Sequence, residues 1–243
     1  MTVSSAQPDL SLIIPFYNEE QSVAVVVAEV RTALEEADII YELILIENGS
    51  WDGTRQQLLS VQNDRCIHVV LLDNNQGYGG AILTGLGQAR GRFVGYMAGD
   101  GQIEPRDVVR VFGYAQQHGV AMAKLSRTVR EDGLLRCVTS VVYNWLFRLM
   151  FRINVMDVNG SPKVLPRQVF AQLSPVSRDW FLDAELVLRV SRCGWRIVEV
   201  PGRFRKRVTG HSHVRLSAVL EFLRNIVQWR VRFRHGVGVE IRR

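Results

Sequence analysis

Cysteine is scarce in this chain of 243 residues, and its placement argues against a cross-linked protein. The three cysteines, Cys66, Cys137 and Cys193, are odd in number and far apart, so their spacing predicts neither a disulfide framework nor paired zinc ligands. This favours a reducing compartment. Residues 1–9 are polar and carry no signal-peptide pattern, so we expect them to be disordered and the protein to be cytoplasmic.

Long apolar runs are also missing. A helix that spans a bilayer needs roughly 18 consecutive apolar residues. Arginines interrupt the best candidates in this chain, at Arg148, Arg152, Arg215, Arg224 and Arg230. We therefore expect no transmembrane segment and, at most, a peripheral place on the cytoplasmic face of a membrane.

Two common ligand-binding patterns are absent as well. A dinucleotide-binding fold needs Gly-x-Gly-x-x-Gly after a strand, but Ile82 stands at the third glycine position counted from Gly77. The formal charge is +6, yet no nucleic-acid-binding module can be recognised. We therefore expect neither a dehydrogenase nor a nucleic-acid partner.

Alternating apolar runs and helical patterns predict an α/β fold. Strands are expected at residues 10–15, 42–46, 68–72 and 93–97, and helices at residues 23–34, 54–61 and 81–89. Such strand–helix steps imply a mostly parallel, Rossmann-like sheet flanked by helices, with ligands bound beyond the carboxyl ends of the strands. Because 47% of the residues are hydrophobic, a chain of this length can bury one large core.

The most informative stretch follows the fourth expected strand. Asp100 and Gln102 stand where that strand ends, interleaved with Gly99 and Gly101. Oxygen ligands at this position suit Mg²⁺ or Mn²⁺ bridging a diphosphate, because hard cations prefer oxygen and phosphates complete the shell. The same residues fit an Asp-Gly turn after a buried strand, and only their context can decide.

That context resembles family 2 glycosyltransferases of the GT-A fold. Within the family, the sequence is most similar to polyprenyl-phosphate glycosyltransferases, which include dolichol-phosphate mannosyltransferase. The likeness covers about residues 10–215, and the segments that carry it, in order, are residues 14–19, 48–54, 75–79, 89–91, 99–102, 157–164 and 203–213. The resemblance implies an inverting transferase that moves a sugar from a nucleotide-diphosphate sugar to a polyprenyl phosphate.

The resemblance also implies roles for the matching residues. The nucleotide sugar is expected at Pro15, Tyr17, Asn18, Glu19, Glu47, Asn48, Asp52, Gly77 and Gly79. Phosphate groups are expected at Lys163, Arg207, Ser212 and His213, and the metal, Mg²⁺ or Mn²⁺, at Asp100 and Gln102. The catalytic residues are expected to be Asp100, Gln102, Lys163 and Arg207. Asp183 joins them as the candidate base if the acceptor is a hydroxyl.

Simpler interpretations exist for some of these residues. Asn18 and Glu19 would serve equally as caps of the helix expected at residues 23–34, and Arg207 as one solvated charge in a basic run. Asp183 is either a base for a hydroxyl acceptor or the N-cap of a helix at residues 184–190. A phosphate acceptor needs no base, because it is already an anion.

Three departures from the family pattern bear on the site. Ala98 occupies the first acidic position of the usual Asp-x-Asp metal motif, so one oxygen ligand is missing. Glu47 and Asn48 replace the usual pair of aspartates, which affects the choice of base, and His213 replaces a lysine near the phosphate. The loss at Ala98 keeps open a catalytically silent relative that only binds. A soluble glycosyltransferase acting on a small hydroxyl acceptor is the other alternative.

Basic residues are concentrated at the end of the chain. We expect three regions: a disordered start at residues 1–9, a GT-A catalytic domain at residues 10–212, and a basic amphipathic helix and tail at residues 213–243. Residues 138–153 form a second pattern with an apolar face and basic edges. Both patterns fit an anionic membrane surface, from which a lipid acceptor would be drawn, and both fit packing on the core or a homodimer interface.

Overall fold

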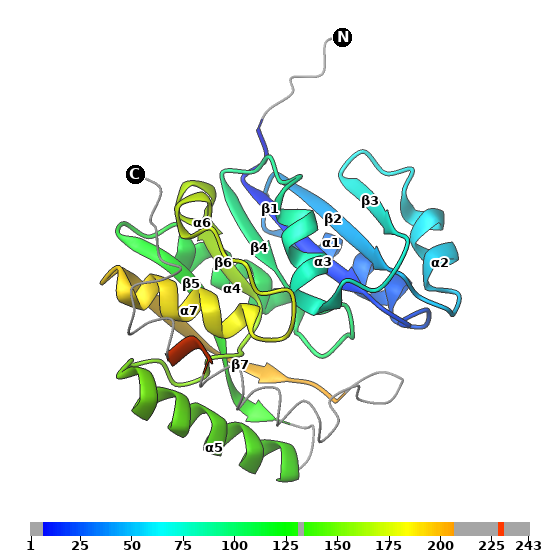
Figure 1. Ribbon diagram of the computed structural model, residues 1–243. Helices are drawn as coiled ribbons and strands as arrows, with labels where there is room; N and C mark the ends of the chain where they lie inside the picture. The colour runs from blue at the N-terminus through cyan, green and yellow to red at the C-terminus, as the bar shows by residue number, and fades with distance from the viewer. Residues whose placement is uncertain (1–6, 131–133, 207–227, 231–243) are drawn as a thin grey trace.

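The computed structural model of the chain describes residues 7–130, 134–206 and 228–230 (Figure 1). Within these residues a seven-stranded sheet has the order β3-β2-β1-β4-β6-β5-β7. Its strands are β1 (Leu10–Phe16), β2 (Tyr41–Asn48), β3 (Ile67–Leu72), β4 (Phe93–Tyr96), β5 (Val120–Arg130), β6 (Lys163–Pro166) and β7 (Arg196–Phe204). Only β6 runs against its neighbours, so the prediction of a mostly parallel sheet is confirmed.

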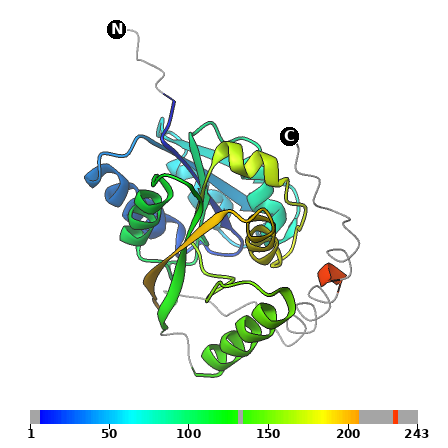
Figure 2. The same ribbon diagram turned by 90° about the vertical axis from the view of Figure 1, so that its left-hand side faces the viewer.

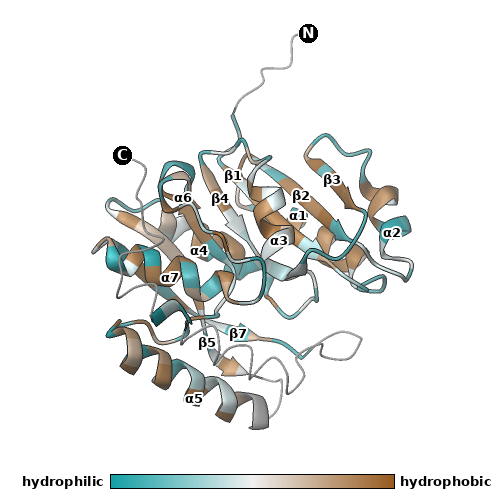
Figure 3. Ribbon diagram, in the orientation of Figure 1, coloured by the Kyte–Doolittle hydropathy of each residue, from teal (hydrophilic) through white to brown (hydrophobic). Residues whose placement is uncertain are grey.

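Helices cover both faces of this sheet (Figure 2). They are α1 (Val23–Glu36), α2 (Thr54–Val61), α3 (Gly77–Leu86), α4 (Pro105–Ala115), α5 (Leu134–Phe151), α6 (Arg167–Leu173) and α7 (Leu182–Arg192). Buried side chains of α1, α2 and α4 pack on one face, and those of α3, α6 and α7 pack on the other. The central strands are therefore apolar on both sides, as their colour in Figure 3 shows.

Alternation along β1 shows how the sequence builds these two layers. Leu12 and Ile14 point into the layer with α1 and α4, while Ile13 between them points into the layer with α3 and α7. In the register, Ile13 pairs with Ile44 of β2 and Tyr96 of β4, and all three share the second layer. Full burial of each such side chain contributes about 1.5–3 kcal/mol. This two-sided core holds the carboxyl ends of the strands in place.

The predicted element boundaries differ most at α3. Its start was expected at Ala81, but the helix begins at Gly77. That expectation is wrong because Gly77 and Gly79 form the first turn, packed so closely on residues 177–179 that an added Cβ would lie 2.5 Å from a carbonyl oxygen. The backbone N–H of Gly80 donates to the carbonyl of Arg178 at 2.8 Å. Long-range packing, rather than local propensity, sets this boundary.

The two predicted amphipathic segments fare differently. The segment expected at residues 138–153 is helix α5, which begins earlier, at Leu134, and ends at Phe151. The helix and tail predicted for residues 213–243 lie outside the described residues, except for a short helical stretch at residues 228–230. There, Trp229 is buried against Phe181, with ring centroids 5.5 Å apart. Among the described residues, no helix combines the length and the apolar character needed to cross a bilayer.

Candidate functional site

Loops at the carboxyl ends of β1 and β2 bind each other and form one polar platform. The Asn18 side-chain oxygen accepts a hydrogen bond from the backbone of Trp51 at 3.0 Å, and the Asn18 backbone donates to the Ser50 hydroxyl at 3.1 Å. The Glu19 backbone donates to the Thr54 hydroxyl at 2.8 Å. Asn18 has φ 55°, a left-handed conformation that asparagine tolerates better than most residues. The N-cap of α1 is Ser22, so the alternative that Asn18 or Glu19 caps this helix is wrong.

Glu47 and Asn48, at the end of β2, are buried and hold the neighbouring turns. Glu47 accepts hydrogen bonds from the backbone of Ser50 at 2.5 Å and from Arg55 Nε at 3.1 Å. The Asn48 side-chain oxygen, Oδ1, accepts a hydrogen bond from the backbone N–H of Gln76 at 2.9 Å, which ties β2 to the start of α3. Both residues therefore shape the platform, and their predicted contact with the base stays a prediction.

The remaining predicted nucleotide-sugar residues border the same platform. Asp52 accepts hydrogen bonds from the backbone and the hydroxyl of Thr54, at 3.0 and 2.5 Å. Pro15 and Tyr17 are half-buried at the end of β1, next to Asn18. Gly77 and Gly79 face residues 177–179, so the close approach that they permit is to that loop.

The loop after β4 carries Asp100 and Gln102, both of them buried. Gly101 between them has φ 72°, and the Gln102 backbone donates to Asp100 Oδ1 at 3.2 Å. Gln102 Nε2 donates to the carbonyl of Arg205 at 3.0 Å, and the Arg205 backbone donates back at 2.8 Å. The loop is thus fixed to the chain just beyond β7. Arg207, Ser212 and His213 follow that point and lie outside the described residues.

The donor set at this loop fits a divalent ion only as part of a larger shell. Asp100 offers a single carboxylate as a metal ligand. The Gln102 amide nitrogen is used in the bond to Arg205, so its amide oxygen is available as a second ligand, whereas Ala98 offers none. Among the described residues, no group of three or more His, Cys, Asp or Glu side chains is placed to hold a metal. Mg²⁺ typically takes one or two carboxylates and fills its shell with phosphate oxygens and water. Asp100 and Gln102 therefore suit a metal that arrives with a diphosphate.

Asp183 belongs to a buried cluster with Lys163 and Tyr96. Its Oδ1 accepts hydrogen bonds from the Tyr96 hydroxyl at 2.7 Å and from Lys163 Nζ, which also donates to the Gly160 carbonyl at 2.8 Å. The α7 N-cap is Phe181, so the alternative that Asp183 caps this helix is wrong. Asp183 instead lies in the first turn of α7, where its carboxylate is bonded to Tyr96 and Lys163.

Burial controls the ionisation of this cluster. It lowers the pKa of Lys163 below the ordinary lysine value, while the charge of Asp183 acts in the opposite direction. It raises the pKa of Tyr96 well above its ordinary value, and the nearby Asp183 charge adds to that effect. Because Lys163 has no exposed surface, its described contacts make it the partner of Asp183. Its predicted contact with phosphate stays a prediction.

Tyr78 is a site residue that the sequence analysis missed. Its ring stacks on Trp180, with centroids 4.4 Å apart and planes 14° from parallel. Burial raises the pKa of the Tyr78 phenol well above its ordinary value, and the charges of Asp183 and Asp100 raise it further. The phenol therefore lies within electrostatic reach of both carboxylates. Its place between two glycines in the first turn of α3 was the available signal.

The buried Lys124 and the half-buried Arg127 hold residues 156–162 in place. This segment is called the acceptor-side loop, after the role proposed for it below. Arg127 pairs with Asp157 at 2.7 Å and lies over the Phe204 ring, 5.4 Å from its centroid. Lys124 Nζ donates to the backbone carbonyl of Asp157, and Glu199 accepts hydrogen bonds from the backbone of residues 156 and 157. Burial lowers the pKa of Lys124 to about 8, and Arg127 holds the pKa of Asp157 far below its usual range. Only Asp157 had a sequence signal, the motif at residues 157–164.

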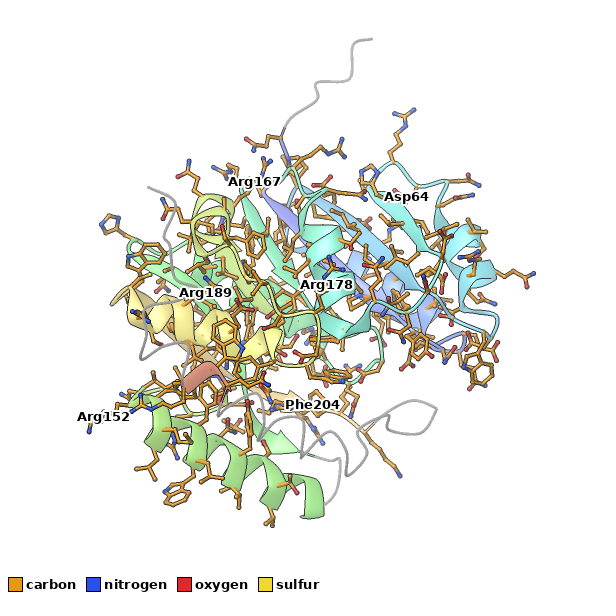
Figure 4. All side chains as sticks on the ribbon, viewed as in Figure 1. Asp64, Arg152, Arg167, Arg178, Arg189 and Phe204 are labelled. Atoms are coloured by element: carbon orange, nitrogen blue, oxygen red, sulfur yellow. The ribbon has the colours of Figure 1, made fainter. Side chains whose placement is uncertain are left out.

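Contacts between these parts place them at one edge of the sheet. Figure 4 shows Phe204 at the end of β7 and Arg178 beside α3. The Ser22 hydroxyl, at the start of α1, donates to the Gly99 carbonyl at 2.7 Å, and the charges of Asp100 and Asp183 both act on the Tyr78 phenol. These contacts bring the loop after β4 to the β1 loop and place Asp183, with its partner Lys163, on the same side. The arrangement offers oxygen ligands, fixed backbone turns and a carboxylate at the carboxyl ends of parallel strands, where α/β folds bind nucleotides.

Comparisons with known proteins agree with this geometry. The chain matches the profile described as glycosyl transferase family 2 over residues 11–173. It is 30% identical over 168 residues to the dodecaprenyl-phosphate galacturonate synthase of Rhizobium johnstonii, covering 68% of this chain and half (50%) of that relative's length. It is also 30% identical over 247 residues to the polyprenol monophosphomannose synthase of Mycolicibacterium smegmatis, covering 96% of this chain and 91% of that relative.

Among solved structures, the fold is similar to glucosyl-3-phosphoglycerate synthase from Mycobacterium tuberculosis in complex with Mn²⁺, uridine diphosphate and phosphoglyceric acid. The TM-score is 0.73 at 19% identity, over 95% of this chain and 79% of that chain. This similarity confirms the predicted GT-A fold.

Proposed function

Because the chain belongs to glycosyl transferase family 2, we propose that it moves a sugar, with inversion, from a nucleotide-diphosphate sugar to a polyprenyl phosphate. The observation that carries the proposal is the convergence of Asp100, Asp183 and the β1 and β2 loops at the carboxyl edge of the sheet. Relatives named for dodecaprenyl phosphate and polyprenol support the class of acceptor. The identity of the sugar and of the base follows from neither.

The proposed reaction is a single displacement. An oxygen of the acceptor phosphate attacks the anomeric carbon, and the bond from that carbon to the diphosphate breaks. The electron pair of that bond leaves with the nucleoside diphosphate, and no proton has to be removed. The chain's part is to orient the two reactants and to favour the charge that develops on the leaving diphosphate. We assign this task to Arg127, which bonds to Asp157 of the acceptor-side loop and whose charge acts on the Tyr78 phenol.

A divalent metal completes the proposed donor site. Asp100 and Gln102 would hold it together with the diphosphate, and it would supply positive charge to the leaving group. The solved relative described with Mn²⁺ and uridine diphosphate supports this assignment. Phosphate binding by Arg207, Ser212 and His213 belongs to the same proposal, as does a catalytic domain at residues 10–212.

The second candidate is transfer to a hydroxyl of a small, soluble acceptor. Asp183 favours it, because both described hydrogen bonds of its carboxylate go to Oδ1, which leaves Oδ2 for a proton. With a hydroxyl acceptor, Asp183→Asn should lower kcat by about 10²–10⁴-fold, the usual contribution of a general base. With a phosphate acceptor, the loss in folded protein should stay below about tenfold.

A transfer assay with matched acceptors tests the proposal. Nucleotides come first: UDP, GDP and dTDP, each with and without Mn²⁺, identify the base by the thermal shift that they produce. The matching sugar nucleotides are then offered with undecaprenyl phosphate, undecaprenol and 3-phosphoglycerate. We expect transfer to undecaprenyl phosphate alone. Transfer to 3-phosphoglycerate would favour the soluble alternative, and nucleotide binding without any transfer would indicate the silent relative.

A further inference from the structure

Helix α5 presents a row of exposed apolar side chains. The row recurs at helical spacing, and 49–67% of each member is exposed: Val138, Val141, Val142, Trp145 and Leu149. The opposite side of the helix packs inward, where Phe147 is fully buried against Phe181. The five exposed residues are called the α5 apolar face below. Isolated exposed apolar residues are ordinary, but a contiguous row marks an interaction surface.

This face is continuous with the acceptor-side loop. Met156, in that loop, is 59% exposed, and its sulfur lies 3.2 Å from Arg148 Nη1 of α5. The Asn144 side chain, on the inner side of α5, accepts a hydrogen bond from the backbone of Val158 at 2.9 Å. In both ribbon views α5 lies at one end of the molecule, beyond the end of β5 (Figures 1 and 2). Whatever covers the α5 apolar face therefore lies beside the loop that borders Asp183.

Charge distinguishes between the occupants of this face. Helix α5 contains no Asp or Glu, and Arg148 and Arg152 stand at its C-terminal end. Arg152 is exposed, as its position at the edge of the molecule in Figure 4 shows. A second copy of the helix would bring arginines against arginines without an acidic partner on α5. An anionic lipid surface complements both the apolar row and its basic end.

We infer that the α5 apolar face and Met156 insert into the interface of an anionic bilayer and turn the acceptor-side loop toward the lipid headgroups. The inference rests on the proposed function, because it explains how a lipid phosphate reaches Asp183 and Arg127. In this arrangement the acyl chain stays in the bilayer along α5. Only the phosphate has to enter the site.

Vesicle flotation tests the inference without any reaction. The full-length protein is mixed with vesicles of phosphatidylcholine, with or without phosphatidylglycerol. The test variant is Trp145→Ser/Leu149→Ser, and the control is Val25→Ser/Tyr114→Ser, which removes side chains of similar exposure (46% and 41%) from α1 and α4. We expect the test variant to bind at least about tenfold more weakly, since two apolar side chains lose their insertion. The control should bind like the wild type.

The Arg152→Gln variant measures the electrostatic contribution to vesicle binding. It should weaken binding to the anionic vesicles by about fivefold and leave binding to the neutral ones unchanged. The inference would be overturned if the wild-type protein does not bind anionic vesicles, or if the test variant binds them as strongly as the control does. A concentration-dependent dimer that the test variant abolishes would overturn it too, because a second copy would then cover the face.

A water-soluble acceptor separates this inference from the proposed function. Citronellyl phosphate in vesicle-free buffer needs no membrane, so the wild type and the test variant should use it equally. Undecaprenyl phosphate in vesicles should be used only by protein that binds them. If the wild type binds vesicles but transfers sugar to neither acceptor, the proposed function is wrong, whereas membrane binding by the α5 apolar face is supported. Equal use of vesicle-bound acceptor by a variant that no longer binds would refute the membrane route.

Discussion

Replacing Asp183 with asparagine should destabilise the protein through Lys163. The substitution preserves the shape of the side chain and its bond from Tyr96, but it removes the negative charge that Lys163 faces. Lys163 has no exposed surface, and its other described bond is to the neutral carbonyl of Gly160. The ammonium group would then be buried without a hydrogen-bonded counter-ion, and only the charge of Asp157, which is paired with Arg127, would still favour its charged form.

The expected magnitude follows from that burial. Removing one partner of a buried ion pair typically costs about 3–5 kcal/mol, because the other charge is left uncompensated. Lys163→Met should cost a similar amount by stranding the carboxylate. The double variant removes both charges, so its loss should be smaller than the sum of the single losses by about 1–3 kcal/mol.

Urea unfolding of the single and double variants at two pH values measures these losses of stability. Burial already lowers the pKa of Lys163, and loss of Asp183 lowers it further, so the native variant releases this proton at a lower pH than the unfolded chain. Between the pKa of Lys163 in the native variant and its pKa in the unfolded chain, the unfolded state binds more protons, so the unfolding free energy rises with pH. The stability of the variant relative to the wild type should therefore recover as the pH rises from 7 towards about 10. Single losses below about 1 kcal/mol, or strictly additive losses, would refute the reasoning.

Three further predictions concern other parts of the site. Asp100→Asn should remove the part of the nucleotide-induced thermal shift that depends on Mn²⁺, and an unchanged shift would contradict the proposed metal position. Burial lowers the pKa of Lys124 from 10.5 to about 8, so the unfolded chain binds more protons between these values. The unfolding free energy of the wild type relative to Lys124→Met should therefore rise with pH by up to about 3 kcal/mol, and urea titrations showing a flat difference would contradict this. Gly79→Ala should cost about 1–3 kcal/mol in the same titrations, because its Cβ would lie 2.5 Å from the Ser177 carbonyl, whereas Gly113→Ala, with open space, should be neutral or stabilising.

The half of the fold that contains β1 to β4, called the donor half here, was predictable because its signals are local. Apolar runs that end in polar turns set β1 to β4, and α2 was predicted at its observed bounds, Thr54–Val61. The position of Asp100 and Gln102 at the end of β4 was predictable because an apolar run stops there, and parallel strands place their carboxyl ends at one edge. The same rule brought the β1 and β2 loops to that edge. Local periodicity and turn chemistry therefore sufficed for this part of the site.

The half that contains β5 to β7 and the acceptor-side loop, called the acceptor half here, was not predictable from local sequence patterns. Strand β5 contains Lys124 and Arg127, charges that normally indicate an exposed segment, yet Lys124 is fully buried. It is buried because Asp157 and Glu199, distant in sequence, supply its partners. Strand β6 has only four residues and runs antiparallel between β4 and β5, so it interrupts the strand–helix repeat on which the prediction depended. Pairings of this kind are tertiary facts that periodicity does not encode.

This division has a functional consequence. The donor platform is built by β1, β2 and the loop after β4, whereas the acceptor-side loop is held by β5 and β7 through Arg127, Lys124 and Glu199. Contacts between the halves include those of Asp183 with Tyr96 and of Gln102 with Arg205, and the Ser161 hydroxyl also donates to the Tyr96 carbonyl at 3.3 Å. Substitutions on the β1 and β2 loops should therefore change KM for the sugar nucleotide, and those at Arg127 should change KM for the acceptor. Substitutions at Asp183 and Gln102 should change both, because each of these side chains bonds to a residue of the other half.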